Sequence, residues 1–266
     1  MELNGRVTVV TGGASGIGRA LAGRLVAADV RGVVVADLDG PGAEAVATAL
    51  GDRAIGFGCD VADEEQIDGL IAATEEAFGP VDIFFANAGV GTGSGLDAPD
   101  ELWDQSWNVN VKAHILAARR LVPIWIERGE GYFVSTASAA GLLSQIGDAP
   151  YSVTKHAAVA FSEWLALTYG DRGLNVSCLC PMGVNTAMLN AGLDMEDEHG
   201  IGARVVAAAG RILEPEDVAD TVLEAVADER FLILPHPEVG EFLRRKGDDP
   251  ERWLAGMRRL QAQVTG

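Results

Sequence analysis

The feature that most constrains the fold is a regular alternation of short apolar runs with longer amphipathic segments. The runs at 6–11 (RVTVVT) and 30–38 (VRGVVVADL) have the length of strands, and the segment from Gly18 that joins them has helical spacing. Further strands are predicted at 54–61, 81–89, 131–138, 174–181 and 231–235, and further helices at 41–50, 64–78, 100–127 and 151–171. Nearly continuous apolar strands that alternate with helices indicate a parallel sheet buried on both faces. We therefore predict an α/β fold with a doubly wound parallel sheet flanked by helices on both faces.

The composition supports one soluble domain. The chain has 266 residues, of which 48% are hydrophobic and 22% are charged, and this is enough apolar material for a full core. Its first residues lack the basic start and uninterrupted apolar stretch of a secretory signal, and no run approaches the ~18 apolar residues of a membrane span. We expect a cytoplasmic protein without a membrane partner.

Charge and the pattern of metal-ligand residues exclude several functions. The net charge of -19 disfavours a nucleic-acid partner, because such binding depends on Lys and Arg neutralising phosphates. Cys59, Cys178 and Cys180 lack metal-ligand spacing, so we expect small buried side chains, with Cys178 and Cys180 on the same side of a strand. The four histidines form no cluster in the sequence, and we expect no catalytic metal.

A glycine-rich turn, TGGASGIG at 11–18, follows the first strand and opens the first helix. Glycine allows close backbone approach to a pyrophosphate, and the helix N-terminus offers unpaired N–H groups, although a tight turn without a ligand would use similar residues. Asp37 ends the second strand, where a carboxylate can accept hydrogen bonds from ribose hydroxyls. The same carboxylate repels a 2′-phosphate, and neither Ser15 nor Leu38 supplies a cation, so NAD is favoured over NADP.

The stretch YSVTK at 151–155 places a phenol and an ammonium one helical turn apart on one face. Such a pair is often an amphipathic contact that bridges core and solvent. The chemical alternative is acid–base catalysis. A phenol with a reference pKa of about 10 is a poor base at neutral pH, but a nearby ammonium and a positive nicotinamide both favour the phenolate.

Several further motifs follow in order between these two: Asp60-Val61, Asn87-Ala88-Gly89, Asn110 and Ser138. With them, the chain resembles the classical short-chain dehydrogenase/reductase (SDR) family over about residues 4–235. The resemblance implies a Rossmann-type fold in a single dinucleotide-binding and catalytic domain, 1–266, with a substrate lid at about 186–212 and a C-terminal tail at about 236–266. It also implies a homo-oligomer, with a tetramer favoured and a dimer possible.

The resemblance assigns roles to individual residues. Tyr151 is the catalytic acid/base, Lys155 lowers its pKa and holds the nicotinamide ribose, and Ser138 hydrogen-bonds the substrate oxygen. Asn110 supports a water-based proton relay, or it bridges secondary structure. The choice of Ser138 over Ser135 rests on the family motif. The residues expected to contact NAD are Gly12, Ser15, Gly16, Ile17, Gly18, Asp37, Asp60, Val61, Asn87, Ala88, Gly89, Tyr151, Lys155, Pro181, Gly183, Val184 and Thr186.

Two parts of this assignment stay open. Asn87-Ala88-Gly89 could mainly stabilise the central sheet. The stretch PMGVNT at 181–186 resembles the family segment that holds the nicotinamide carboxamide, but Met182 stands where glycine is commonest. The backbone path around Met182 is therefore uncertain from the sequence, and Met182 could instead border the substrate.

Apolar residues in the lid, and Leu142, Leu143 and Ile146 after Ser138, suit an apolar substrate, although any lid needs apolar residues to fold down. In the tail, a helix is predicted from about Pro250, and we expect its apolar stripe to serve packing. The sequence thus predicts an NAD(H)-dependent oxidoreductase that interconverts an apolar secondary alcohol and its ketone by hydride transfer, with Tyr151 as acid/base.

Three alternatives are weighed against this function. A 3-oxoacyl-thioester reductase would more naturally use NADPH and present a basic docking surface, which Asp37 and the acidic balance disfavour. A non-catalytic dinucleotide-sensing protein would not need the complete set of Ser138, Tyr151 and Lys155. A sugar-nucleotide epimerase of the extended family shares the Tyr–Lys pair, but its glycine spacing differs and its substrate domain is generally longer.

Overall fold

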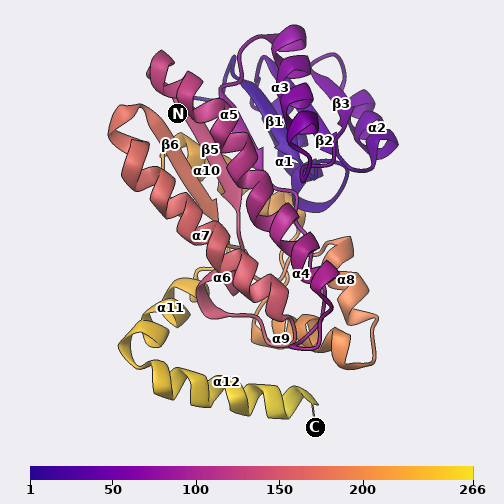
Figure 1. Ribbon diagram of the computed structural model, residues 1–266, viewed down its shortest axis with the longest axis vertical. Coiled ribbons are helices and arrows are strands. Elements are labelled where there is room, and N and C mark those ends of the chain that lie inside the picture. Colours follow the sequence, from indigo (N-terminus) through magenta and orange to yellow (C-terminus); the bar gives the residue numbers. More distant parts are fainter. Residues whose placement is uncertain (266) are drawn as a thin grey trace.

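The chain folds around one parallel sheet (Figure 1). The computed structural model describes residues 1–265, and within them seven strands lie in the order β3-β2-β1-β4-β5-β6-β7, all paired parallel. The strands are β1 (Val7–Thr11), β2 (Gly32–Asp37), β3 (Ala54–Gly58), β4 (Ile83–Ala86), β5 (Gly131–Thr136), β6 (Leu174–Leu179) and β7 (Leu232–Ile233). The predicted doubly wound α/β sheet is confirmed. Its direction of winding reverses between β1 and β4, which opens a crevice at the carboxyl ends of these strands.

Helices cover both faces of this sheet. One face is packed by α1 (Gly16–Ala27), α2 (Gly40–Leu50) and α10 (Pro215–Ala227). The other face is packed by α3 (Glu64–Phe78), α5 (Ala113–Arg128) and α7 (Ala149–Tyr169). The remaining helices are α4 (Asp100–Trp107), α6 (Ala140–Leu143), α8 (Ala187–Leu193), α9 (Ile201–Ala209), α11 (Glu238–Asp248) and α12 (Pro250–Thr265), with short turns η1 (Asn108–Lys112), η2 (Gly170–Arg172) and η3 (Glu198–Gly200).

The central strands explain the near-continuous apolar runs. Val9 of β1 pairs with Val34 of β2 and with Phe84 of β4, and all three side chains pack under α3 and α5. The next residue, Val10, faces the opposite core under α1 and α10. Because successive side chains of a strand point to opposite faces, a strand with helices on both sides needs apolar residues at every position.

Helix boundaries differ from the sequence-based prediction, most of all between residues 100 and 127. The segment predicted as one helix at 100–127 is α4 and α5 joined by η1, a π-helical turn centred on Asn110. The helix α7 begins at Ala149, two residues before Tyr151. The predicted strand at 231–235 is shorter than expected. The cysteines are buried as predicted, and the sulfurs of Cys178, in β6, and Cys180, just after β6, lie 3.8 Å apart.

Four helices of the C-terminal part of the chain, α8, α9, α11 and α12, lie beyond the carboxyl edge of the sheet, whereas α10 and β7 belong to its layers. The helices α8 and α9 occupy the segment predicted as a lid, α11 lies to their left in the view of Figure 1, and α12 runs below them. The predicted helix from Pro250 is present as α12, whereas α11 was not foreseen from the sequence. Within residues 1–265, no helix is at once long and apolar enough to cross a membrane.

Candidate active site

The glycine turn between β1 and α1 leaves the start of α1 open to a ligand. Ser15 is the N-cap residue, but its side chain makes no capping hydrogen bond, so the first N–H groups of α1 keep their donor capacity. Gly12 has φ +66°, and a Cβ there would come within 2.9 Å of the Ala88 Cα. A Cβ on Gly18 would clash with the Gly12 carbonyl oxygen. The turn is therefore a backbone cradle that fits the pyrophosphate of a dinucleotide.

Asp37 lies beside this turn at the end of β2. Its Oδ2 accepts a hydrogen bond of 3.0 Å from the Ala14 N–H, and its Oδ1 accepts one of 3.0 Å from the Asp39 N–H. A carboxylate offers about four acceptor positions, so each oxygen can still accept a bond from a ribose hydroxyl. Asp60 is placed at the end of β3 by an Asx turn in which it accepts from the Ala62 N–H at 2.9 Å, and its neighbour Val61 is buried.

Asn87 ties three strands of the sheet together. Its Nδ2 donates to the Thr11 carbonyl of β1 at 2.9 Å, and its Oδ1 accepts from the Thr136 hydroxyl of β5 at 3.1 Å. The Thr11 hydroxyl in turn accepts from the N–H groups of Asn87 and Ala88, at 3.0 and 3.1 Å. These contacts support the structural role that the sequence left open for Asn87-Ala88-Gly89.

Tyr151 and Lys155 lie one turn apart in the first half of α7, as the spacing predicts. Lys155 is 2% exposed, and its Nζ donates to the Thr136 carbonyl at 2.9 Å while lying 5.6 Å from the centre of the Tyr151 ring. Tyr151 itself is half-buried. The helix holds the phenol and the ammonium in one place, because the carbonyl at the end of β5 anchors the longer side chain.

Burial acts on both titratable groups. It lowers the pKa of Lys155 to about 8, which leaves the ammonium largely charged at neutral pH. It raises the pKa of the Tyr151 phenol, although the nearby Ser138 hydroxyl works in the opposite direction. The family resemblance predicts that Lys155 lowers the pKa of Tyr151. In the protein alone, desolvation of the phenol outweighs any such effect.

Ser138 lies two residues beyond β5 and is 7% exposed. Its Oγ accepts from the Ala140 N–H at 3.1 Å and donates weakly to the Pro181 carbonyl at 3.4 Å. Ser135, the competing serine, is fully buried inside β5 and hydrogen-bonds His114 Nδ1 at 3.0 Å. The geometry therefore favours Ser138 as the serine available to a substrate.

The Asn110 side chain hydrogen-bonds other groups of the protein. Its Oδ1 accepts from the Val90 N–H and its Nδ2 donates to the Val90 carbonyl, both at 2.9 Å, and Nδ2 also reaches the Thr154 hydroxyl at 3.1 Å. These bonds join η1 to the loop after β4 and to α7, which favours the bridging role for Asn110. Gly89 lies between Asn110 and Lys155, since a Cβ there would be 3.2 Å from Asn110 Oδ1 and 3.1 Å from Lys155 Nζ.

Sequence reasoning missed Asp148, which caps α7. This buried carboxylate accepts from the Tyr151 N–H at 3.0 Å, from the Thr92 N–H and hydroxyl at 2.8 and 2.9 Å, and from the Gly93 N–H at 2.8 Å. It thereby joins the loop after β4 to the helix that carries Tyr151. An Asp ahead of a Pro-containing helix start is a capping signal that could have identified it.

His236 was also missed. It follows β7, is 2% exposed, and hydrogen-bonds the backbone of the segment 181–186. The second buried histidine is His114, for which burial, with a smaller contribution from the Lys155 charge, lowers the pKa to about 3. Among the described residues, no three His, Cys, Asp or Glu side chains gather into a group that could hold a metal ion.

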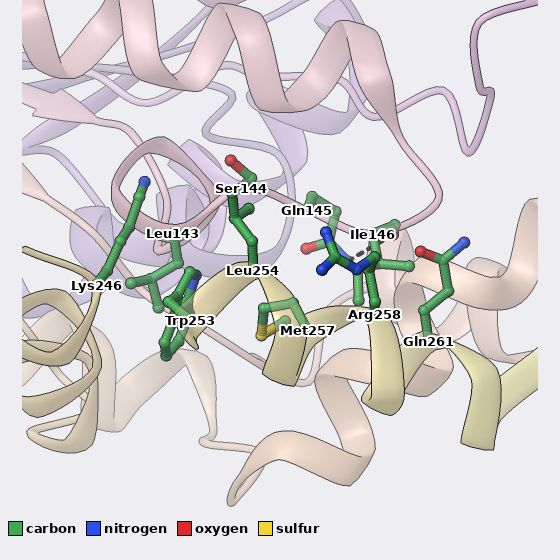
Figure 2. A pocket seen from close by; sticks show the side chains of 10 residues that line it. All are labelled: Leu143, Ser144, Gln145, Ile146, Lys246, Trp253, Leu254, Met257, Arg258 and Gln261. Carbon is green, nitrogen blue, oxygen red and sulfur yellow. Dashed lines mark hydrogen bonds between the residues drawn. The ribbon is translucent and has the colours of Figure 1, made fainter. Parts of the chain in front are cut away.

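A pocket of about 210 Å³ lies between the loop at 143–146 and α12 (Figure 2). Leu143 and Ile146, which the sequence suggested as substrate contacts, face Trp253 and Met257 of α12 here. The pocket contains none of the predicted catalytic residues. Trp253 and Met257, from the apolar stripe of α12, therefore face residues of the same chain across this pocket, and the packing role of the stripe stays a prediction.

A parallel sheet with this strand order, a glycine-lined cradle at its carboxyl edge and a Tyr–Lys pair beside it define a Rossmann-type protein. The sequence matches the short chain dehydrogenase family over residues 6–197. The chain therefore belongs to the short-chain dehydrogenase/reductase family.

Individual relatives agree with this assignment. The chain is 36% identical to a 2,5-dichloro-2,5-cyclohexadiene-1,4-diol dehydrogenase of Sphingobium indicum over 85% of this chain and 92% of that protein. It is 35% identical to a 1-deoxy-11-beta-hydroxypentalenate dehydrogenase of Streptomyces exfoliatus, over 96% and 92% of the two chains. A crystal structure of an SDR from Burkholderia phymatum in complex with NAD superposes with a TM-score of 0.85 at 33% identity, and covers 94% of this chain and 96% of that one.

Proposed function

We propose that this protein is an NAD(H)-dependent oxidoreductase that interconverts an apolar secondary alcohol and its ketone, with Tyr151 as acid/base. The observation that carries the proposal is the placement of Tyr151 one turn from the buried Lys155 and close to Ser138, at the sheet edge that also carries the glycine cradle. Each group the reaction needs is present at this edge, namely a proton carrier, a cation and a hydroxyl donor.

In alcohol oxidation, the Tyr151 phenolate accepts the proton of the substrate hydroxyl while Ser138 Oγ hydrogen-bonds the same oxygen. When bound, NAD would supply the hydride acceptor, and its positively charged nicotinamide would favour the phenolate that burial disfavours. The Lys155 ammonium adds to that attraction, because it remains largely charged at neutral pH. Ketone reduction runs the same proton transfer in reverse, from the neutral phenol to the substrate oxygen.

The preference for NAD over NADP is part of this proposal and rests on Asp37. The Asp37 carboxylate lies at the end of β2 against the glycine turn, where it would repel a 2′-phosphate. The similar SDR structure is a complex with NAD, which supports the same cofactor. The relatives named for a cyclohexadiene-diol and a hydroxypentalenate support a cyclic, largely apolar alcohol as the substrate.

We also propose a homo-oligomer, with a tetramer favoured. The outer side of α7 exposes large apolar side chains: Trp164 is 52% exposed and Leu167 is 87% exposed. Phe161 stacks on Trp164 with their ring centres 6.4 Å apart. Exposed apolar patches of this kind are typical of protein–protein interfaces.

The test follows NADH absorbance at 340 nm for the wild type, Tyr151→Phe and Tyr169→Phe. NAD is offered with cyclic secondary alcohols, NADH with the matching ketones and one 3-oxoacyl thioester, and each assay is repeated with NADP(H). We expect NAD-linked turnover that rises with pH in the oxidation direction, and a loss of at least about 100-fold in kcat for Tyr151→Phe. Tyr169 lies at the far end of the same helix, so Tyr169→Phe should keep wild-type activity.

Three outcomes would contradict the proposal. Equal turnover by Tyr151→Phe and wild type would remove Tyr151 from the chemistry. Preferred turnover of the thioester with NADPH would favour a 3-oxoacyl-thioester reductase, and cofactor binding without turnover of any alcohol or ketone in a broad panel would favour a dinucleotide-sensing protein.

A further inference from the structure

The segment 181–186 follows β6 and runs between two parts of the candidate site. At its start, the Pro181 carbonyl accepts from the Ala139 N–H at 2.8 Å, next to Ser138. At its end, Thr186 caps α8 and lies against Gly16 of the glycine turn. The path of this segment therefore determines which of its backbone N–H and C=O groups face the space between Ser138 and the glycine turn.

His236 holds the middle of this segment from outside. Its Nδ1 accepts from the Met182 N–H at 3.1 Å, and its Nε2 lies 3.1 Å from both the Gly183 and the Arg211 carbonyl oxygens. Because Nδ1 accepts, the ring hydrogen is on Nε2, which donates to the two carbonyls. One imidazole thus hydrogen-bonds the N–H of Met182 and the carbonyl of Gly183. It also bonds the carbonyl of Arg211, near the end of the segment predicted as a lid.

Burial makes this arrangement rigid. The His236 side chain is 2% exposed, and a buried polar group without its partner costs free energy comparable to a lost hydrogen bond. The neighbouring backbone is paired as well, since the Leu213 N–H donates to the Gly183 carbonyl at 2.9 Å and the Asn185 N–H donates to the Leu213 carbonyl at 2.8 Å. Hydrogen bonds to His236 and to the backbone of Leu213 therefore fix the backbone conformation of residues 182–185.

We infer that His236 is a positioning residue, which sets the backbone of 181–186 so that it can bind the nicotinamide end of the dinucleotide. This inference rests on the proposed function, because it takes the cofactor to be NAD and this segment to contact it.

The test compares binding of NADH and of ADP-ribose, which contains the adenosine half and the second ribose but no nicotinamide. His236→Phe removes both hydrogen-bonding atoms and keeps a ring of similar size. His236→Asn keeps an acceptor near the position of Nδ1. The matched control is His156→Asn, because His156 hydrogen-bonds only the Ser152 carbonyl of its own helix among the described contacts.

We expect the Kd for NADH, measured by fluorescence titration, to rise about tenfold in His236→Phe, which is the order of effect for one lost hydrogen bond to a buried backbone group. His236→Asn should recover part of this loss, and His156→Asn should match the wild type. The Kd for ADP-ribose should stay within about twofold of the wild-type value in all three variants.

The outcomes separate this inference from the proposed function. If wild type binds NADH and turns over an alcohol, but His236→Phe binds NADH equally well, the positioning role is wrong and the proposed function stands. If NADH and ADP-ribose weaken by the same factor, His236 acts only on the stability of the fold, and the inference fails. A wild type that binds neither compound overturns both proposals. Melting temperatures of all variants show that the titrations are made on folded protein.

Discussion

At the residue scale, burial decides which groups can carry charge. His114 is 1% exposed, and its pKa of about 3 lies well below the ordinary value of 6.5. Between these two pH values the unfolded chain binds a proton that the folded protein excludes, so stability is lost as the pH falls from about 6.5 towards about 3. From pH 7 to pH 5, wild type should lose about 2 kcal/mol of unfolding free energy through this group, and His114→Asn should not. Urea unfolding at both pH values measures the difference.

The control for this prediction is His199→Asn, because His199 is half-exposed in η3. It should follow the pH dependence of the wild type. The substitution at 114 can lower stability at both pH values by leaving Ser135 with a poorer partner, so the change between pH 7 and pH 5 is the quantity to compare. An equal loss in His114→Asn and wild type would show that His114 is not the neutral buried group described above.

At the scale of elements, Asp148 joins the loop after β4 to the start of α7. Asp148→Ala would leave the N–H groups of Tyr151, Thr92 and Gly93 without their acceptor, so we expect a loss of at least about 2 kcal/mol in unfolding free energy. The Asp148 charge also raises the pKa of Tyr151. Its removal should therefore shift the pH profile of alcohol oxidation to lower pH. Denaturant unfolding and pH–rate profiles measure the two effects.

A suitable control is Asp171→Ala, since Asp171 is exposed in the turn that follows α7. It should alter neither stability nor the pH profile. A pH profile of Asp148→Ala that coincides with that of the wild type would mean that the carboxylate acts only as a helix cap, with no effect on the Tyr151 proton.

At the scale of the whole molecule, the apolar face of α7 is the interface we propose for a homo-oligomer. A glutamate at Leu167 or Trp164 would place a charge that must be desolvated in any interface formed by this face. We expect Leu167→Glu combined with Trp164→Glu to reduce the solution mass, measured by light scattering, from the oligomer to a smaller species. Leu96→Glu, at a residue 95% exposed in the loop after β4, is the control and should leave the mass unchanged. An unchanged mass in the double variant would exclude the α7 face as the main interface.

The sequence was sufficient for features that are encoded locally. Strand and helix periodicity predicted the sheet, because each strand buried on both faces needs apolar residues at every position. TGGASGIG and YSVTK are short motifs whose geometry depends only on a turn or on one helical turn. The burial of the three cysteines followed from their small apolar side chains in strand segments. The boundaries failed mainly at Asn110, where a π-helical turn depends on contacts with Val90 and Thr154.

Tertiary structure alone decided the partners of buried polar groups. Asp148 and His236 reach backbone groups far away in the sequence, at Thr92 and at Met182, and no local pattern indicates which N–H each will accept. The same holds for the pKa of Tyr151. Its upward shift arises because the folded chain removes water from the phenol. By itself, the sequence determined the strands of the sheet, most of the helices that cover it, and which residue types stand at the sheet edge. Only the tertiary structure decided how those residues are held and charged, because hydrogen bonding and desolvation depend on neighbours brought together by folding.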